Sequence, residues 1–328
     1  MILSEVIHFS TISIALLWVL MLGGLAILFF AGESLTHGAV GMARKMNIPK
    51  LVIGLTIVSI ATSMPEMIAS LFGALQGNTG MAIGNLVGSN IANLGLILGL
   101  STLLLPLKVE MSIIKKEMPI LILVSFLFWF FANKQQSIDR FEGVILLAIM
   151  LFYITHLYCF VKKKGNRENK PDEFSTKSPP NWFRIMVCLV LGSLGLALGA
   201  DLVVQSAVEI AHRFGVSDFL IGITIIAFGT SCPELVACIT AAIKKHPELV
   251  AGNVIGSNIF NLLLIGGTVS TITTLPIKNQ WLSVEFPLMI GITLLSWLFL
   301  HTKREVNRLE GSILLLFYIG AMAASFLY

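Results

Sequence analysis

Long runs of apolar residues, separated by short polar segments, fill this chain from end to end. A helix of about 20 residues crosses the ~30 Å hydrocarbon core of a bilayer, and most of the runs reach that length. They predict an all-α polytopic membrane protein with ten transmembrane helices, at residues 11–31, 51–76, 81–105, 118–132, 141–161, 184–208, 218–243, 249–273, 284–300 and 310–327. The fourth run is short unless its helix begins near Glu117.

One 40-residue stretch of this pattern occurs twice. Residues 54–93 align with residues 222–261 without a gap, at a constant offset of 168, and 16 of the 40 positions are identical. The first copy contains ATSMPE and GNLVGSNIAN, and the second contains GTSCPE and GNVIGSNIFN. The identities fall on polar, glycine and proline positions, whereas a repeat kept only for packing would keep its apolar pattern. The repeat therefore indicates a cation site built from two halves.

The duplication extends over both halves of the chain, since charged positions such as Glu33 and Asp201 also match at this offset. We divide the chain into an N-terminal five-helix repeat (1–163), a short linker (164–182) and a C-terminal five-helix repeat (183–328). Five helices separate the two motifs, and an odd number reverses the direction of crossing. The sequence therefore predicts two inverted repeats with a site near the midplane at their interface, as in many secondary transporters.

Composition and charge agree with a membrane protein and set its orientation. Hydrophobic residues make up 56% of the chain and charged residues 12%, which lies outside the range of soluble globular proteins. Of the 22 lysines and arginines, 18 fall on one predicted side and 4 on the side of the N-terminus. The positive-inside rule then makes the linker 164–182 cytoplasmic and places both termini outside, in what we expect to be the cell membrane.

The remaining composition predicts few partners. The four cysteines show no paired spacing, so we expect neither a disulfide nor a zinc site. We expect no cofactor and no nucleic acid. The expected partners are the lipid bilayer and transported ions, with the chain acting as a monomer.

Glu66 and Glu234 are the acidic residues that we place deep within spans. A charge at the bilayer centre costs at least ~2.5–3.5 kcal/mol, so such a residue suggests a function. No lysine or arginine lies at matching depth, and the partner must be a proton or a metal cation. The alternative is a pair of permanently protonated structural glutamates.

Prolines precede both glutamates. Pro65 and Pro233 lack an N–H, which leaves the carbonyls of Ala61 and Gly229 without their helical partners. Such broken helices occur in membranes where they line a cavity or are buried in protein, so these carbonyls are candidate cation ligands. A simple proline kink is the alternative.

Each copy also places polar residues four apart. Thr62 precedes Glu66 by four residues, which predicts that both lie on one helix face. Thr230 and Glu234 have the same spacing, and two longer stripes follow at Asn85, Ser89 and Asn93 and at Asn253, Ser257 and Asn261. Their oxygens suit calcium or sodium, although interhelical hydrogen bonds are an alternative role.

These two segments resemble the α-repeats of the sodium/calcium exchanger branch of the calcium/cation antiporter superfamily. The resemblance covers nearly the whole chain and implies the same ten-helix inverted fold, with one central calcium site that alternates with several sodium sites. It also implies that helices 1 and 6 slide as the moving gate. By position it implies calcium ligands at Glu66 and Glu234 and the carbonyls of Thr62 and Thr230, sodium ligands at Ser63, Ser231, Ser89 and Ser257 and near the carbonyls of Ser59 and Ala227, and a lining role for Asn93 and Asn261.

Two positions refine this expectation. Potassium-dependent exchangers are among the relatives that carry aspartate at the position of Asn261, so asparagine argues against potassium dependence. Proton/calcium relatives carry an acidic residue soon after the Gly-Asn pair, which neither copy has here. We therefore predict an electrogenic sodium/calcium antiporter and not an enzyme. The alternatives are a proton/calcium antiporter of the same fold, an intramembrane enzyme and a passive cation channel.

Overall fold

The structure of the chain is a computed structural model that describes residues 9–165, 181–215 and 227–327. Most of the predicted linker 164–182, and residues 218–226 of the predicted seventh span, with the start of the second motif, lie outside the described residues. In the described ranges the chain forms α1 (Ile14–Met46), α2 (Lys50–Ile53), α3 (Ser59–Thr62), α4 (Met64–Leu75), α5 (Thr79–Ala92), α6 (Leu98–Leu104), α7 (Met118–Gln135), α8 (Arg140–Gly165), α9 (Trp182–Arg213), α11 (Ala227–Thr230), α12 (Cys232–Ile243), α13 (Pro247–Phe260), α14 (Gly266–Ile272), α15 (Asn279–Ser283), α16 (Glu285–Lys303) and α17 (Arg308–Leu327).

Many of these helices can cross a bilayer. Among the described residues, seven continuous helical stretches are long and apolar enough: Ile14–Met46, Thr79–Leu104, Arg140–Cys159, Trp182–Arg213, Pro247–Ile272, Asn279–His301 and Arg308–Ser325. The pair Lys50–Thr62 and Met64–Leu75, bent by 43°, forms an eighth crossing if it is one span. The prediction of an all-α polytopic membrane protein is confirmed. The predicted span 118–132 lies within α7, and α12 is a shorter apolar helix inside the predicted span 218–243.

The first helix is longer than the apolar run that predicts it. The run ends at residue 31, but α1 continues to Met46 and stops where Asn47 adopts a left-handed backbone conformation with φ 53°. Polar residues interrupt the apolar run in this extension, yet Ala39 and Ala43 on one face are buried. All six residues from Gly38 to Ala43 are buried, so the extension is packed on every side. The apolar run in the sequence does not predict a helix that small and polar residues continue.

The helix boundaries repeat as the sequence does. Three helices of the first half have counterparts of the same length at the offset of the sequence repeat: α4, α5 and α6 correspond to α12, α13 and α14. The short strands also have counterparts at this offset. β1 (Leu107–Lys108) pairs with β4 (Glu305–Val306), and β2 (Ser137–Ile138) pairs with β3 (Leu275–Pro276).

The strand register is reciprocal between the halves. Leu107 faces Val306 in one antiparallel pair, and Leu275 faces Ile138 in the other. Leu107 and Leu275 are equivalent positions of the repeat, and so are Ile138 and Val306. Each half therefore contributes the same two strands to opposite pairs, as a two-fold axis between the halves would require.

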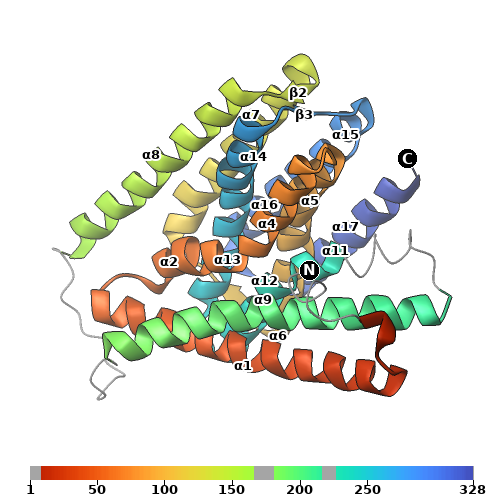
Figure 1. Ribbon diagram of the computed structural model, residues 1–328. Helices are drawn as coiled ribbons and strands as arrows, with labels where there is room; N and C mark the ends of the chain where they lie inside the picture. Colours follow the sequence, from red (N-terminus) through yellow and green to blue (C-terminus); the bar gives the residue numbers. More distant parts are fainter. Residues whose placement is uncertain (1–8, 166–180, 216–226, 328) are drawn as a thin grey trace.

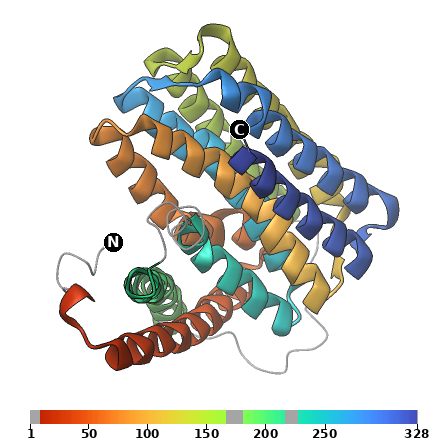
Figure 2. The same cartoon turned by 90° about the vertical axis from the view of Figure 1, so that its right-hand side faces the viewer.

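The long helices α1 and α9 run side by side at one edge of the bundle, where α1 also packs against α12 (Figures 1 and 2). Small residues allow this close approach. A Cβ atom at Gly24 would lie 3.1 Å from the carbonyl oxygen of Gly199, and one at Gly38 would lie 2.9 Å from the amide nitrogen of Leu189. These contacts run in opposite order along the two helices, so α1 and α9 are antiparallel.

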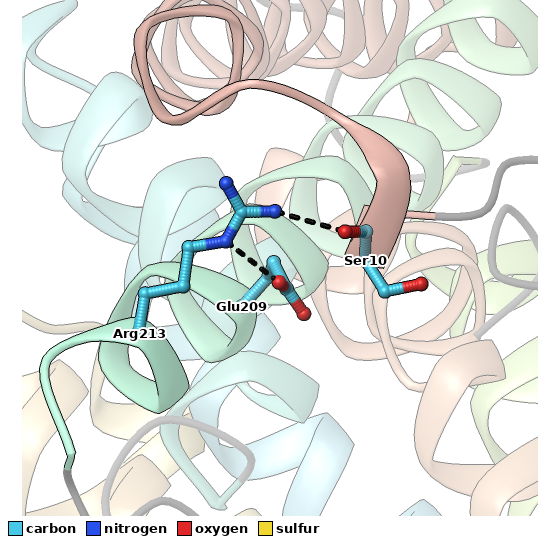
Figure 3. Close-up of polar contacts among 3 residues, drawn as sticks. All are labelled: Ser10, Glu209 and Arg213. Atoms are coloured by element: carbon cyan, nitrogen blue, oxygen red, sulfur yellow. Dashed lines mark hydrogen bonds and ion pairs between the residues drawn. The ribbon is translucent and has the colours of Figure 1, made fainter.

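Polar contacts join the end of α9 to the turn before α1. Arg213 Nε donates to Glu209 Oε1 at 2.8 Å, and its Nη2 donates to the carbonyl oxygen of Ser10 at 3.1 Å (Figure 3). Farther along α1, the ammonium of Lys244 pairs with the carboxylate of Glu33. This second contact ties α1 to the residue that follows α12.

Candidate cation site

The helix that carries the first glutamate is broken beside it. Ser63 separates α3 from α4 with φ −84° and ψ 4°, and Ser231 separates α11 from α12 with φ −87° and ψ 4°. Proline in the first turn of α4 and α12 starts each new helix. The prediction that Thr62 and Glu66 share one helix face is wrong, because the spacing of four assumed an unbroken helix.

The break gives each glutamate a defined electrostatic setting. Glu66 and Glu234 lie in the first turn of α4 and α12, where the aligned peptide dipoles favour negative charge. The short helices α3 and α11 end at Thr62 and Thr230, and the last carbonyls of a helix lack intrahelical partners. Carboxylates and helix-end carbonyls therefore meet at the same breaks.

The two glutamates belong to one buried site. Their exposed fractions are 1% for Glu66 and 2% for Glu234. Ser63 Oγ donates to Glu234 Oε1 at 2.9 Å, and the side chain of Ser231 makes the reciprocal contact with Glu66. The two carboxyl groups also interact directly. Each glutamate is therefore held by a serine from the other half of the chain.

Several oxygens at this place have no hydrogen-bond partner among the described residues. They are Glu66 Oε2, Glu234 Oε2, Asn93 Oδ1 and Asn261 Oδ1, all buried. A buried polar atom without a partner costs about 1–3 kcal/mol. No described lysine or arginine forms an ion pair with either glutamate. An arrangement of unpaired carboxylate and amide oxygens is what a hard cation requires.

The asparagines lie where their helices change pitch. Asn93 and Asn261 begin π-helical segments, Asn93–Ile97 and Asn261–Ile265, between α5 and α6 and between α13 and α14. Such segments are rare and often occur at functional sites. Asn261 Nδ2 donates to Ser89 Oγ at 3.0 Å, another bond between the halves. The regular spacing of polar residues does not reveal these segments.

The remaining predicted ligands make hydrogen bonds or lie on the short helices before the breaks. Ser89 Oγ donates to the carbonyl oxygen of Asn85 at 2.6 Å, and Ser257 Oγ donates to Asn253 Oδ1 at 3.4 Å. The carbonyl oxygen of Ser59 accepts the amide of Ser63 at 2.9 Å. Ala227 begins α11, the short helix that ends at the second break.

Sequence reasoning missed the partners of the first asparagine in each stripe. Asn85 Nδ2 donates to Ser70 Oγ at 2.8 Å, and Asn253 Nδ2 donates to Cys238 Sγ at 3.3 Å. Ser70 and Cys238 occupy matching positions of the repeat but are different residue types. They are therefore not among the identical polar positions that indicate the site. Each of the two residues follows a glutamate of the site by four positions, and this spacing could have identified them.

The second copy is tightly covered at its central glycine. A Cβ atom at Gly256 would lie 2.3 Å from Ser59 Oγ and 2.7 Å from the carbonyl oxygen of Leu55. Gly88, the matching glycine of the first copy, has no described atom within 4 Å of such a Cβ. Asn253 is 1% exposed, whereas Asn85 is only partly buried. The second copy is therefore closely packed at Gly256.

The donor set excludes several kinds of metal site. In the part of the chain that the structure describes, no group of three or more histidine, cysteine, aspartate or glutamate residues could hold a metal ion. Two carboxylates and neutral oxygens are what the site offers. Calcium takes about 6–8 oxygen ligands in a flexible shell, so a cation here would draw on carbonyls and hydroxyls as well.

Comparison with known proteins agrees with this geometry. The family model described as "Sodium/calcium exchanger protein" matches residues 16–159 and 184–327. These two segments are related by the offset of the internal repeat. The chain belongs to the sodium/calcium exchanger family. The family membership makes this exchanger a membrane transporter of cations and not an enzyme.

Similar proteins cover nearly all of this exchanger. CaxA of Alkalimonas amylolytica is 39% identical over 308 residues, which cover 92% of this chain and 96% of that protein. The sodium/calcium exchanger MaX1 of Methanosarcina acetivorans is 33% identical over 94% of this chain and 98% of its own. The solved structure of the sodium–calcium exchanger NCX_Mj superposes with a TM-score of 0.82 at 32% identity, over 95% of this chain and 99% of its own.

Proposed function

We propose that this exchanger moves Ca²⁺ across the membrane in one direction while Na⁺ moves in the other, by alternating access to one central site. The observation that carries the proposal is the pair of buried carboxylates of Glu66 and Glu234, one from each half. The Oε2 atom of each has no hydrogen-bond partner among the described residues. The pair can neutralise one divalent cation or several monovalent cations in turn.

The proposed membrane arrangement is ten transmembrane helices in two inverted five-helix repeats. The antiparallel α1 and α9 support the inversion, because they are counterparts at the offset of the repeat. The strand pairs support it as well: β1 and β4 lie in loops that the inverted topology places on one side, and β2 and β3 in loops that it places on the other. The positive-inside rule then puts both termini outside and the linker 164–182 in the cytoplasm, in the cell membrane.

The proposed ion ligands follow the geometry of the two breaks. Glu66 and Glu234 bind Ca²⁺ together with the carbonyls of Thr62 and Thr230 at the ends of α3 and α11. The Na⁺ ions take the same carboxylates and the oxygens of Ser63, Ser231, Ser89 and Ser257, with the carbonyls of Ser59 and Ala227. Asn93 and Asn261 line the centre, where their unpaired oxygens support this placement.

Na⁺ is the proposed counter-ion, and K⁺ is not required. MaX1 is named a sodium/calcium exchanger, and NCX_Mj structures are described as soaked with Na⁺, Ca²⁺ or Sr²⁺. The Ca²⁺/H⁺ antiporter ChaA of Bacillus subtilis is 23% identical over 77% of this chain, which keeps proton exchange as the second candidate. The neutral amide at Asn261 supports independence from K⁺.

We propose that the exchange is electrogenic. Two carboxylates balance the charge of one Ca²⁺, and about three Na⁺ ions would carry one further positive charge, worth about 2.3 kcal/mol per 100 mV. An inward Na⁺ movement would then drive Ca²⁺ out of a cell with a negative interior. The coupling ratio, and not the site alone, determines this direction.

The proposed moving elements are α1 and α9. They lie at one edge of the bundle, where α1 packs against α12 (Figures 1 and 2). A small cavity between α1 and the α12–α13 pair reaches Asn253, and Leu35, Ala39 and Ala241 line it. The close packing of Gly256 against Leu55 and Ser59 closes the second copy of the site at this point.

The test is ⁴⁵Ca²⁺ uptake into proteoliposomes under one imposed gradient at a time. We expect uptake when the vesicles are loaded with Na⁺, no uptake when they are loaded with K⁺, and no uptake under a proton gradient alone. Three Na⁺ leaving for one Ca²⁺ entering carry one net positive charge out of the vesicle, so an inside-positive potential should accelerate the uptake and an inside-negative potential should slow it. Uptake driven by protons without Na⁺ would move the protein to the second candidate, and uptake driven by membrane potential alone would indicate a channel.

A further inference from the structure

Asn253 connects three segments of the site with its amide group. Its Oδ1 accepts from Thr62 Oγ1 at 3.2 Å and from Ser257 Oγ at 3.4 Å, and its Nδ2 donates to Cys238 Sγ at 3.3 Å. Thr62 belongs to the first half of the chain, whereas Cys238 lies on α12, one turn after Glu234. The side chain is 1% exposed, so these contacts are not exchanged for water.

Asn85 makes the corresponding contacts in the first copy. Its Oδ1 accepts from Thr230 Oγ1 at 3.5 Å, and its Nδ2 donates to Ser70 Oγ at 2.8 Å and to the carbonyl oxygen of Glu66 at 3.1 Å. Thr230 and Ser70 are the repeat counterparts of Thr62 and Cys238. The same bridge therefore occurs twice, in opposite directions across the interface of the halves.

These bridges are not the usual way in which asparagine is satisfied in these helices. Asn90 and Asn258 lie on the same two helices, and each donates to the carbonyl four residues earlier, at 2.6 and 3.0 Å. Asn85 and Asn253 instead bond to other helices. Their amide groups face the threonines at which α3 and α11 end.

We propose that Asn85 and Asn253 are positioning residues that hold each helix-end threonine against the glutamate-bearing helix of the other half. This inference rests on the proposed exchange function, because the threonine carbonyls are proposed Ca²⁺ ligands there. Asn253 Oδ1 lies 3.2 Å from the Thr62 hydroxyl, which it shares with the carbonyl oxygen of Val58 at 3.1 Å. Through Cys238, Asn253 also contacts the helix of Glu234. The carbonyl at the end of one short helix is thus set at a constant place relative to the carboxylate of the other half, before any cation arrives.

We call Ser70 and Cys238 the anchors of the two bridges, because each accepts the Nδ2 hydrogen bond on the glutamate-bearing helix. The two anchors differ in their strength as acceptors. The hydroxyl of Ser70 is a good hydrogen-bond acceptor, whereas the thiol of Cys238 is a weak one. The second bridge therefore depends more on Thr62 and Ser257 than on its anchor. The chain itself supplies the matched substitution, since Cys238→Ser installs the anchor of the first copy.

The test measures ⁴⁵Ca²⁺ equilibrium binding by purified full-length protein, beside KM and maximal rate of Na⁺-dependent uptake. Asn253→Leu removes the amide at similar size, and Thr62→Val removes the hydroxyl while it keeps the carbonyl. We expect each to weaken Ca²⁺ binding about tenfold, as the loss of about 1.4 kcal/mol would, and to raise KM more than it lowers the maximal rate. The double variant should be no weaker than either single variant, because both remove one bridge.

Controls separate positioning from general damage. Asn258→Leu, farther along the same helix, should leave Ca²⁺ binding unchanged even where it lowers the melting temperature. Cys238→Val should weaken binding, and Cys238→Ser should recover it. If Asn253→Leu does not fold, Asn85→Leu tests the same bridge at the less buried position.

Wild-type binding affinity in the Asn253 and Asn85 variants, or a double variant about a hundredfold weaker than wild type, would overturn the inference. A wild-type protein that binds Ca²⁺ but shows no Na⁺-dependent uptake would contradict the proposed exchange instead. The binding arm of the cycle would still decide the role of the two asparagines.

Discussion

Glu234→Gln is expected to weaken Ca²⁺ binding by at least about 100-fold, because a buried charge pair that loses one partner costs about 3–5 kcal/mol. Glutamine keeps the shape of the side chain and one carbonyl oxygen but leaves a divalent cation with a single carboxylate. Glu66→Gln should have the same effect, since the two residues occupy equivalent places at the helix breaks. The measurement is ⁴⁵Ca²⁺ equilibrium binding by purified protein, beside Na⁺-dependent uptake, which we expect to be lost in both variants.

The control for these variants is another buried acid outside the site. Glu117 is 4% exposed and accepts a hydrogen bond from Tyr153 at 2.8 Å. Glu117→Gln removes a buried carboxylate as well, but we expect it to retain Ca²⁺ binding. Unchanged binding in both Glu66→Gln and Glu234→Gln would return the two glutamates to a structural, protonated role.

Gly256→Ala is expected to destabilise the protein strongly. The added methyl group would lie 2.3 Å from Ser59 Oγ, 2.7 Å from the carbonyl oxygen of Leu55 and 2.9 Å from its Cα, so backbone must move. Overpacking of a close-packed core costs typically ~1–3 kcal/mol and occasionally more, and a contact with backbone lies at the upper end. A lower melting temperature of purified protein, with less protein recovered from the membrane, is the expected result.

Gly88→Ala is the matched control, since Gly88 occupies the same position in the first copy. With no described atom within 4 Å of the added Cβ, we expect a melting temperature close to that of wild type. Equal destabilisation by both substitutions would mean that the two copies are packed alike. It would contradict the expectation that the two glycines differ in their surroundings.

The sequence indicated the candidate ligands but not their contacts. The repeat at an offset of 168 identified Glu66 and Glu234 because polar residues were retained in both copies, and an ion site needs its oxygens in both halves. It could not reveal that Ser63 bonds to the glutamate of the other copy. That contact depends on how the two halves pack, and no local pattern records it.

Backbone geometry accounts for the other differences. The spacing of Thr62 and Glu66 fits one helix face, but Pro65 and the conformation of Ser63 separate them into two helices. The prolines predicted such a break, but the spacing of four between the polar residues did not show it. The π-helical segment after Asn93 has no marker in the spacing of polar residues. The bridge from Asn253 to Cys238 was hidden because the first copy has serine at that position.

The most direct test of the account follows ²²Na⁺ and ⁴⁵Ca²⁺ together in the same proteoliposomes, with wild-type protein beside Glu66→Gln. Vesicles loaded with ²²Na⁺ and diluted into ⁴⁵Ca²⁺ should lose Na⁺ as they gain Ca²⁺, with about three Na⁺ leaving for each Ca²⁺ so that one net charge crosses. Neither flux should occur in Glu66→Gln, and neither should occur in wild type when its counter-ion is left out. Entry of Ca²⁺ without loss of Na⁺, or coupled fluxes that persist in Glu66→Gln, would contradict exchange through this site.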